Sequence, residues 1–316
     1  MGYLAAAFSI VVWGVTCVNT RSLLADFSSF EIMVVRFALA WMALWLMSDR
    51  TERWLTFTRL GKLRLRHILY IGMGLCGVVM YQFLENCAIF YTGAANVAIL
   101  MSISPVVNAL LARLAGREGR FNLWMWLGSV VAIAGAVVVS LANGAELEFH
   151  IKGDLMVLGT VFSWGVYSIL IDMANSAGLE VLTVTRKSFF WSLVMMLPVA
   201  VWGTTKAGRT ALDGTFAIVL DHATNVARFS DPLNLFNLVF LGVCASALGF
   251  VFWGFACKRI GMVKSSIGLY LMPLVGVIAA AIFLGERLSV AGWIGGVIIV
   301  IGVAMSNYRP ISLPPR

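Results

Sequence analysis

The sequence predicts an all-α polytopic membrane protein with ten transmembrane helices, arranged as two inverted repeats of five helices. Three observations support this prediction: the apolar composition, ten apolar runs of spanning length, and landmarks that recur in the two halves of the chain. Of the 316 residues, 60% are hydrophobic and 12% are charged. A soluble domain of this length carries a much larger charged share, so the composition indicates a membrane protein.

Each apolar run is long enough to cross a bilayer, because a hydrocarbon core about 30 Å thick needs about 20 helical residues. Helices are expected because backbone polar groups in lipid have to be paired within their own segment. The third and fourth runs are separated only by Tyr91 and Thr92, and Pro273 interrupts the ninth. In order, the expected spans are residues 3–20, 30–48, 67–90, 93–115, 122–141, 153–172, 180–202, 235–257, 262–284 and 289–307.

The distribution of basic residues predicts the orientation of these spans. The connections and tail on the side of the two termini hold 13 Lys and Arg residues, whereas the connections on the other side hold six. The positive-inside rule therefore places both termini in the cytoplasm, and we expect the membrane to be a bacterial inner membrane. The basic residues form no stripe with interleaved aromatic residues, so the net charge of +8 does not indicate a nucleic-acid partner.

The two halves of the chain share landmarks, which predicts two units, residues 1–148 and 149–316. Trp13-Gly14 in the first expected span recurs as Trp164-Gly165 in the sixth, 151 residues later. A repeat of five spans has to enter the membrane from opposite sides in its two copies, which is typical of secondary transporters. The other recurring pairs are Arg36 with Arg186, Gly93 with Gly261, Pro105 with Pro273, and Glu118 with Glu286.

With these landmarks, the chain resembles the EamA-type members of the drug/metabolite transporter (DMT) superfamily over nearly all of residues 3–307. The segment LENCAIFYTGAANVAILMSISP also resembles a subgroup with an E-N-x-A-L-x-Y-T run, with Ile89 in place of its Leu. The resemblance implies a secondary transporter for export or uptake of small metabolites, often amino acids. We expect an exporter that works by alternating access. The resemblance also implies that spans one, three, four, six, eight and nine enclose a central cavity.

Glu85 is the main candidate for substrate binding or coupling. An ionised group near the centre of a membrane helix costs about 2.5–3.5 kcal/mol on insertion scales, so it usually faces a cavity or a partner. At a rise of about 1.5 Å per residue, Arg36 and Glu85 are expected at a similar depth. Two interpretations stay open: Glu85 binds a proton or a substrate ammonium group with Arg36 beside it, or the two form a static interhelical contact.

Further candidates for the cavity are polar or repeat-related. Tyr81 and Gln82 share the third span with Glu85, and helical spacing places them near one face. Lys264 occupies the repeat position of Asn96, on spans that the resemblance assigns to the cavity. For Arg186 and Lys264, snorkelling toward the headgroups is the alternative. The full set of substrate or coupling candidates is Glu85, Arg36, Lys264, Asn86, Tyr81, Gln82, Asn96, Trp13, Trp164 and Arg186.

Other repeated residues are expected to have structural roles. Pro105 and Pro273 free backbone carbonyls within spans four and nine. Glu118 and Glu286 each precede a helix, where a carboxylate suits the positive end of the helix dipole. In the last span, Gly292 and Gly296 form a G-x-x-x-G motif, which fits packing within a monomer and a homodimer equally.

The sequence argues against two other classes of protein, membrane-embedded enzymes and channels. A membrane-embedded enzyme would need paired aspartates or a His-Glu-x-x-His motif at depth, and the sequence holds neither. A channel would show polar residues along a pore, whereas the polar positions here are few and clustered. The sequence holds no nucleotide-binding loop and no Cys-x-x-Cys pair among its five cysteines. We therefore expect no enzyme activity, metal or cofactor, and a small solute and the lipid bilayer as partners, with proton coupling allowed.

Overall fold

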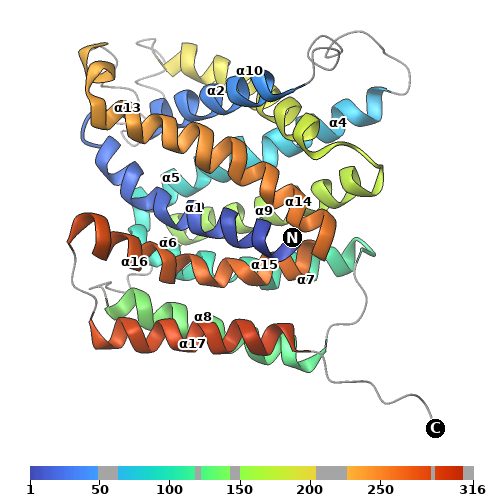
Figure 1. The fold of residues 1–316 in the computed structure, drawn as a ribbon, viewed down its shortest axis with the longest axis vertical. Coiled ribbons are helices and arrows are strands. Elements are labelled where there is room, and N and C mark those ends of the chain that lie inside the picture. Colours follow the sequence, from blue (N-terminus) through green and yellow to red (C-terminus); the bar gives the residue numbers. More distant parts are fainter. Residues whose placement is uncertain (49–62, 118–121, 143–149, 204–225, 286–288, 309–316) are drawn as a thin grey trace.

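The protein is described by a computed structural model, which covers residues 1–48, 63–117, 122–142, 150–203, 226–285 and 289–308 (Figure 1). Within these ranges every regular element is a helix and no strand occurs. In chain order the elements are α1 Gly2–Leu23, α2 Ser29–Met47, α4 Leu63–Gly74, η1 Leu75–Met80, α5 Tyr81–Thr92, α6 Ala94–Met101, α7 Ser104–Leu114, α8 Leu123–Ala142, α9 Ile151–Ser176, α10 Val181–Gly203, η2 Val226–Ser230, α13 Pro232–Val239, η3 Phe240–Leu248, α14 Gly249–Ile260, α15 Met262–Ile267, η4 Gly268–Leu271, α16 Met272–Leu284 and α17 Val290–Asn307.

The all-α polytopic fold is confirmed. Nine described helical stretches are long and apolar enough to cross a membrane, so the chain is a multi-pass membrane protein. The predicted seventh span is a helix of 23 residues, α10, but it is not among the nine. Arg186 and Lys187 lower its hydropathy near its start. The count of ten spans and the inverted repeat therefore stay predictions.

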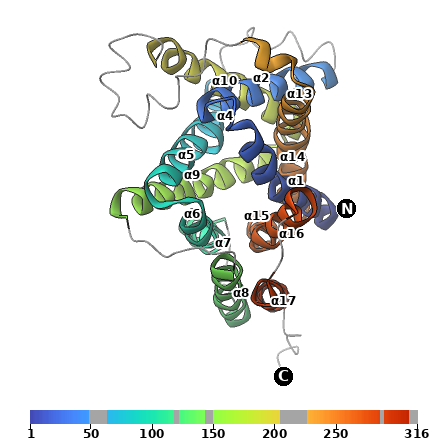
Figure 2. The same cartoon turned by 90° about the vertical axis from the view of Figure 1, so that its left-hand side faces the viewer.

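The helices cross between the two halves of the chain. Helix α1 packs against α14 and α16, whereas α9 packs against α5 and α7. Helix α2 lies along η3, and α10 lies along α2 and α4. Figures 1 and 2 show most of the long helices running in roughly parallel or antiparallel directions, with α1 and α9 inside the bundle. Helices α1 and α9, the first and sixth expected spans, are therefore central. Each packs against spans of the other half of the chain that are divided into shorter helical segments.

Both spans that precede a glycine corner contain a π-helical segment. The segment η1 separates α4 from α5, and η3 separates α13 from α14. A π-helix is rare, and such segments within α-helices are frequently found at functional sites. The two segments end at Met80 and Leu248, each thirteen residues before a glycine corner.

The glycine corners are at Gly93, between α5 and α6, and at Gly261, between α14 and α15. Their backbone angles are nearly the same: φ 81° and ψ 151° at Gly93, φ 87° and ψ 154° at Gly261. This region of the Ramachandran map is essentially restricted to glycine, because a Cβ would clash with the backbone. The short connections between the third and fourth spans, and between the eighth and ninth, therefore depend on glycine.

The prolines begin new helices rather than kink continuous ones. Pro105 lies in the first turn of α7 and Pro273 in the first turn of α16. The preceding helix has ended in each case, at Met101 and at Leu271. A proline fits the first turn because its missing N–H would have no helical partner there. Span four is thus built of two helical pieces, and span nine of three, because η4 separates α15 from α16.

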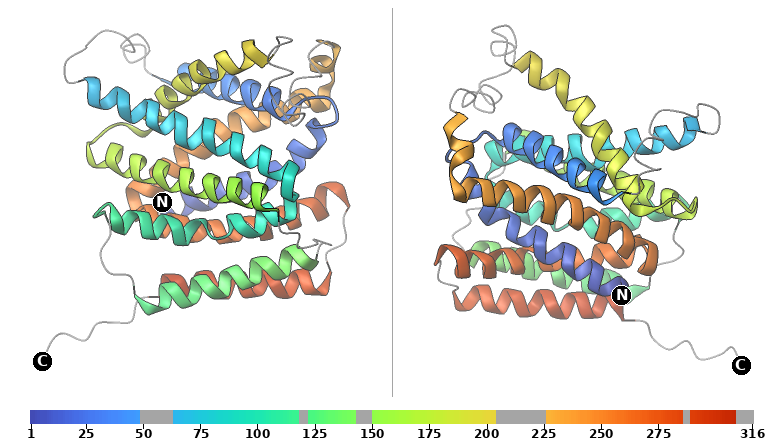
Figure 3. Two further views of the ribbon diagram at one scale, coloured as in Figure 1. Left: turned by 180° about the vertical axis from the view of Figure 1, so that it is seen from behind. Right: turned by 45° about the horizontal axis from the view of Figure 1, so that its top comes forward.

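Helices α8 and α17 form a closely packed pair along one side of the molecule (Figure 3). A Cβ at Gly128 would collide with the backbone of Ser306, and one at Gly135 would lie 2.7 Å from the backbone nitrogen of Ile299. Small residues allow this approach in lipid, where packing rather than the hydrophobic effect holds helices together. In the G-x-x-x-G motif, a Cβ at Gly296 would lie 2.6 Å from Leu274, so this glycine serves packing within the chain.

One end of the bundle, on the left in Figure 1, is tied together by Arg228 of η2. Its guanidinium donates to both carboxylate oxygens of Glu31, at 2.6 and 3.1 Å, and lies 4.6 Å from the centroid of the Phe27 ring. The Arg228 side chain is only 8% exposed. Arg228 therefore fixes the α1–α2 corner to the segment that precedes α13.

The opposite end has a looser ionic contact. Arg117, just beyond α7, donates to Asp172 of α9 at 3.2 Å, and both side chains are about a third exposed, at 30% and 28%. Exposed ion pairs of this kind contribute only about 0–1 kcal/mol. The two ends of the bundle therefore differ in how firmly they are closed.

Candidate functional site

An aromatic cluster occupies the middle of the bundle, where α1, α5, α9 and α14 meet. The ring centroids of Trp13 and Trp164 are 5.6 Å apart in an edge-to-face arrangement. Trp253 lies 5.4 Å from Trp13 and 5.9 Å from Trp164, and Tyr81 lies 5.2 Å from Trp164. The two repeat-related tryptophans are thus in contact with each other. Edge-to-face pairs are favourable because the positive ring edge meets the negative ring face.

The two repeat-related tryptophans differ in their hydrogen bonds. The Nε1–H of Trp13 donates to the carbonyl oxygen of Ala245 in η3, at 2.8 Å. The Nε1–H of Trp164 has no acceptor among the described residues. The neighbouring Ser163 instead donates to the carbonyl oxygen of Cys76 in η1, at 2.8 Å. In both halves, therefore, a π-helical carbonyl accepts a hydrogen bond from α1 or α9.

Arg36 of α2 lies beside this cluster and is buried, with 8% of its surface exposed. Its Nε–H donates to the hydroxyl oxygen of Ser246 in η3, at 2.5 Å. Ser246 is fully buried and follows the residue that Trp13 contacts. Two neighbouring residues of η3 thus receive side chains from α1 and α2.

Glu85 of α5 is half-buried, one helical turn beyond Tyr81. Its charge interacts with that of Arg36. The expected pairing is only indirect, because the two side chains form no ion pair in the part of the chain that the structure describes. Gln82 and Asn86 are half-buried on the same helix. Arg36, Tyr81 and Glu85 are therefore brought together, with space between the two charges.

Asn96 is held at the first glycine corner. Its amide Nδ2 donates to Thr92 Oγ1 at 2.5 Å and to Asp154 Oδ1 at 2.9 Å. Thr92 also donates to the same carboxylate oxygen, at 2.9 Å. Asp154 lies in the first turn of α9, so this group fixes the α5–α6 corner to α9. The structure gives Asn96 a bracing contact, and its role in substrate binding stays a prediction.

Two further substrate candidates, Lys264 and Arg186, lie within described helices, whereas the two repeated glutamates were expected to be structural. Lys264 is half-buried in α15, and Arg186 is buried in α10. Glu118 and Glu286 lie outside the residues that the structure describes. Nothing in the structure tests whether any of these residues binds a substrate.

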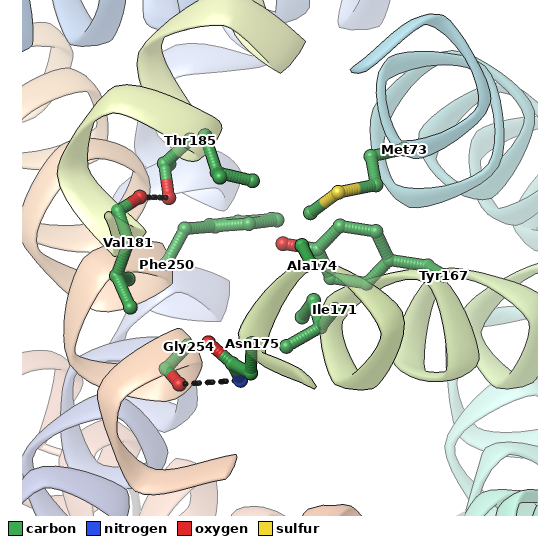
Figure 4. Close-up of a pocket in the computed structure, with 10 residues that line it drawn as sticks. Met73, Tyr167, Ile171, Ala174, Asn175, Val181, Thr185, Phe250 and Gly254 are labelled. Atoms are coloured by element: carbon green, nitrogen blue, oxygen red, sulfur yellow. Dashed lines mark hydrogen bonds between the residues drawn. The ribbon is translucent and has the colours of Figure 1, made fainter. Parts of the chain in front are cut away.

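A narrow cleft borders the aromatic cluster, lined by residues of α4, α9, α10 and α14 (Figure 4). Tyr167 and Phe250 form its inner wall, and Asn175 closes one side by donating to the carbonyl oxygen of Gly254 at 3.4 Å. Its volume of about 10 Å³ is room for a water-sized group and no more. The other lining residues are Met73, Ile171, Ala174, Val181, Val184 and Thr185. This cleft is therefore too small to hold a metabolite.

Sequence reasoning missed Trp253, Phe250 and Ser246. The repeat could have indicated Trp253, because it lies eight residues before Gly261, as Glu85 lies eight residues before Gly93. Phe250 and Ser246 carried no such signal. A serine in an apolar helix is common, and only the fold brings Ser246 to Arg36, 210 residues away in sequence.

Proteins of similar sequence are named as transporters, and a solved structure has a similar fold. A protein of Streptantibioticus cattleyicolor named "Probable terminal-alkyne amino-acid exporter" is 30% identical over 242 residues, which is 76% of this chain and 72% of that protein. An uncharacterized transporter of Archaeoglobus fulgidus is 24% identical, with 97% of each chain covered. A solved crystal structure has the same fold, with a TM-score of 0.72 at 18% identity, covering 97% of this chain and 96% of the other.

The profile described as the EamA-like transporter family matches residues 1–141 and again residues 151–308. The two matches together span almost all of the described helices. Family members and relatives are named as transporters rather than enzymes. The chain therefore belongs to the EamA-like transporter family and is a multi-pass membrane transporter.

Proposed function

We propose that this transporter exports an amino acid across a bacterial inner membrane by alternating access, with Glu85 as the group that binds a proton or the substrate ammonium. The relative from Streptantibioticus cattleyicolor, which is named as a probable amino-acid exporter, supports the substrate class. An exchanger or uniporter of another small organic solute is the alternative.

The observation that carries the proposal is the state of Glu85. Its carboxylate lies within a membrane-spanning stretch and makes no hydrogen bond or ion pair to another described residue. A carboxylate there is costly unless it has a partner. A proton or a substrate ammonium would supply that partner during transport. The charge of Arg36 lies nearby.

Alternating access requires that the two ends of the bundle open in turn. With both termini in the cytoplasm, the Arg228–Glu31 contact closes the outer end and the cleft of Figure 4 lies toward the inner end. We take residues 1–148 and 149–316 as the units that rock against each other. The matching glycine corners at Gly93 and Gly261 support this division, because each joins two spans of one unit.

The test is counterflow of labelled amino acids in proteoliposomes, with and without a pH gradient, for wild type and Glu85→Gln. We expect Glu85→Gln to lose accumulation driven by the gradient. Asp172→Asn is the matched control, because it neutralises an exposed carboxylate near the inner end. The control should retain accumulation.

Each outcome separates the interpretations of Glu85. If Glu85→Gln keeps exchange but loses accumulation, Glu85 couples transport to protons. If exchange is lost as well, Glu85 binds the substrate. Unchanged exchange and accumulation would show a static role for Glu85 and refute the proposal for this residue. If wild type carries no amino acid, the amino-acid substrate class is wrong.

A further inference from the structure

Arg36 is a buried cation of which only one edge is held. The bond from its Nε–H to Ser246 is the single hydrogen bond that it makes to the described residues. Its two terminal nitrogens make none to the described residues, although Arg36 as a whole residue is only 8% exposed. A guanidinium is permanently charged and has five N–H donors in a fixed fork, which matches the two oxygens of a carboxylate.

The hydrogen bond from Nε to Ser246 determines which way the two terminal nitrogens of Arg36 face. Ser246 is fully buried in the π-helical segment η3, and it holds Nε from the side of the second half of the chain. The aliphatic part and the Nε of Arg36 are thereby immobilised. The remaining donors lie on the outer edge of the guanidinium, which has to find an anion or carry the cost of a buried, unpaired charge.

Glu85 does not itself occupy that edge. The charges of Glu85 and Arg36 interact without an ion pair. A cation and an anion that interact without forming an ion pair can bind, between them, a molecule that carries one negative and one positive group. An α-amino acid is such a molecule, because its carboxylate and ammonium are separated by one carbon atom.

We propose that Arg36, positioned by Ser246, binds the carboxylate of a zwitterionic amino acid whose ammonium group faces Glu85. This inference rests on the proposed function and deepens it, because it assigns a separate protein group to each charge of the substrate. Tyr81 lies one helical turn before Glu85, and its ring centroid is 5.2 Å from that of Trp164, so these rings are placed to contact the amino-acid side chain. The site therefore selects substrates by the presence of both charges.

The first experiment changes the substrate and leaves the protein as it is. Uptake into proteoliposomes is measured for L-phenylalanine and L-leucine, for the amines phenethylamine and isopentylamine, which lack the carboxylate, and for the two N-acetyl amino acids, which lack the ammonium. We expect wild type to carry the amino acids and to discriminate at least about tenfold against both analogue classes, since each lost charged hydrogen bond is worth about 1.5–3 kcal/mol.

The second experiment changes the positioning residue. Ser246→Ala is expected to raise the KM for the amino acid about tenfold, because the guanidinium loses the bond that orients it. The maximal rate should change little, and Ser246→Thr, which keeps the hydroxyl, should restore the KM. Ser168→Ala is the matched control, since Ser168 is equally buried but donates only to a carbonyl of its own helix, at 2.9 Å.

The outcomes distinguish this inference from the proposed function. If wild type carries the amino acids and the amines equally well, amino-acid transport stands and the carboxylate subsite is refuted. The subsite is equally refuted if Ser246→Thr is as defective as Ser246→Ala, or if Ser168→Ala shows the same rise in KM. If no amino acid is carried at all, the proposed function fails together with the inference.

Discussion

The stretch from α4 through η1 to α5 and the stretch from α13 through η3 to α14 have nearly the same backbone and different chemistry. Each contains a π-helical segment, and each ends at a glycine with a φ near 85°. Eight residues before that glycine, the first stretch has Glu85 and the second has Trp253. The carboxylate lacks a direct partner among the described residues, whereas the indole is fully buried in the aromatic cluster.

This difference teaches that the backbone and the side chains have separate tasks. The π-helical segments and glycine corners determine where the two stretches bend. The side chain at the matching position then determines whether a stretch offers a charge or fills the centre of the bundle. Arg36 interacts with both stretches: its Nε–H donates to Ser246 of η3, and its charge interacts with that of Glu85 of α5 without an ion pair. Ser246 of the second stretch therefore positions the cation whose charge interacts with Glu85 of the first stretch.

The strongest test of the comparison is at Trp253. Because this side chain is fully buried, Trp253→Ala should lower the free energy of unfolding by about 3 kcal/mol through the cavity that it leaves. Thermal unfolding of the purified protein in detergent measures the effect, with Trp253→Phe as the smaller change. Glu85→Gln should leave the midpoint nearly unchanged. If Glu85→Gln lowers the unfolding midpoint more than Trp253→Ala does, Glu85 rather than Trp253 stabilises the bundle, and the comparison is wrong.

The glycine corners should respond equally to substitution. Gly93→Ala and Gly261→Ala each place a Cβ in a region of the Ramachandran map that costs about 1–3 kcal/mol. At Gly93 no neighbouring atom lies within 4 Å of such a Cβ, so the cost there comes from the backbone itself. Unfolding in detergent would again report it. If one variant is tolerated and the other is not, the two corners are not equivalent.

The smallest expected difference is between the two repeat-related tryptophans. Trp13→Phe removes the hydrogen bond to Ala245 of η3 and should cost about 1 kcal/mol more than Trp164→Phe, whose indole N–H has no described acceptor. Each phenylalanine keeps an aromatic ring in the cluster, so each variant serves as the control for the other. Equal midpoints would show that the bond to η3 adds no net stability.

Much of the fold was predictable from the sequence because lipid imposes a simple rule on it. Apolar runs have to become helices, and the observed elements follow the expected spans within a few residues, for example α16 ending at Leu284. The glycine and proline landmarks are also structural boundaries, at Gly93 and Pro105 for instance. The π-helical segments were not predictable, because no residue type marks a wider helical turn.

The site was predictable only in part. Glu85, Arg36 and Tyr81 were recognisable as polar residues in apolar surroundings, and the structure brings them together. Asn96 was expected at the cavity, and in the structure it braces a corner through Asp154 of α9. The bond between Arg36 and Ser246 depends on how α2 packs along η3, and no local pattern contains that information.

The close pairing of α8 and α17 has a consequence for how the protein is made. Helix α8 ends at Ala142, but its partner begins at Val290 and is therefore synthesised much later. Until then, the glycine face around Gly128 and Gly135 can meet only lipid or other nascent helices. Insertion of α17 thus completes the packing of the fifth span. Premature termination before Val290 would leave α8 for the membrane quality-control machinery to recognise.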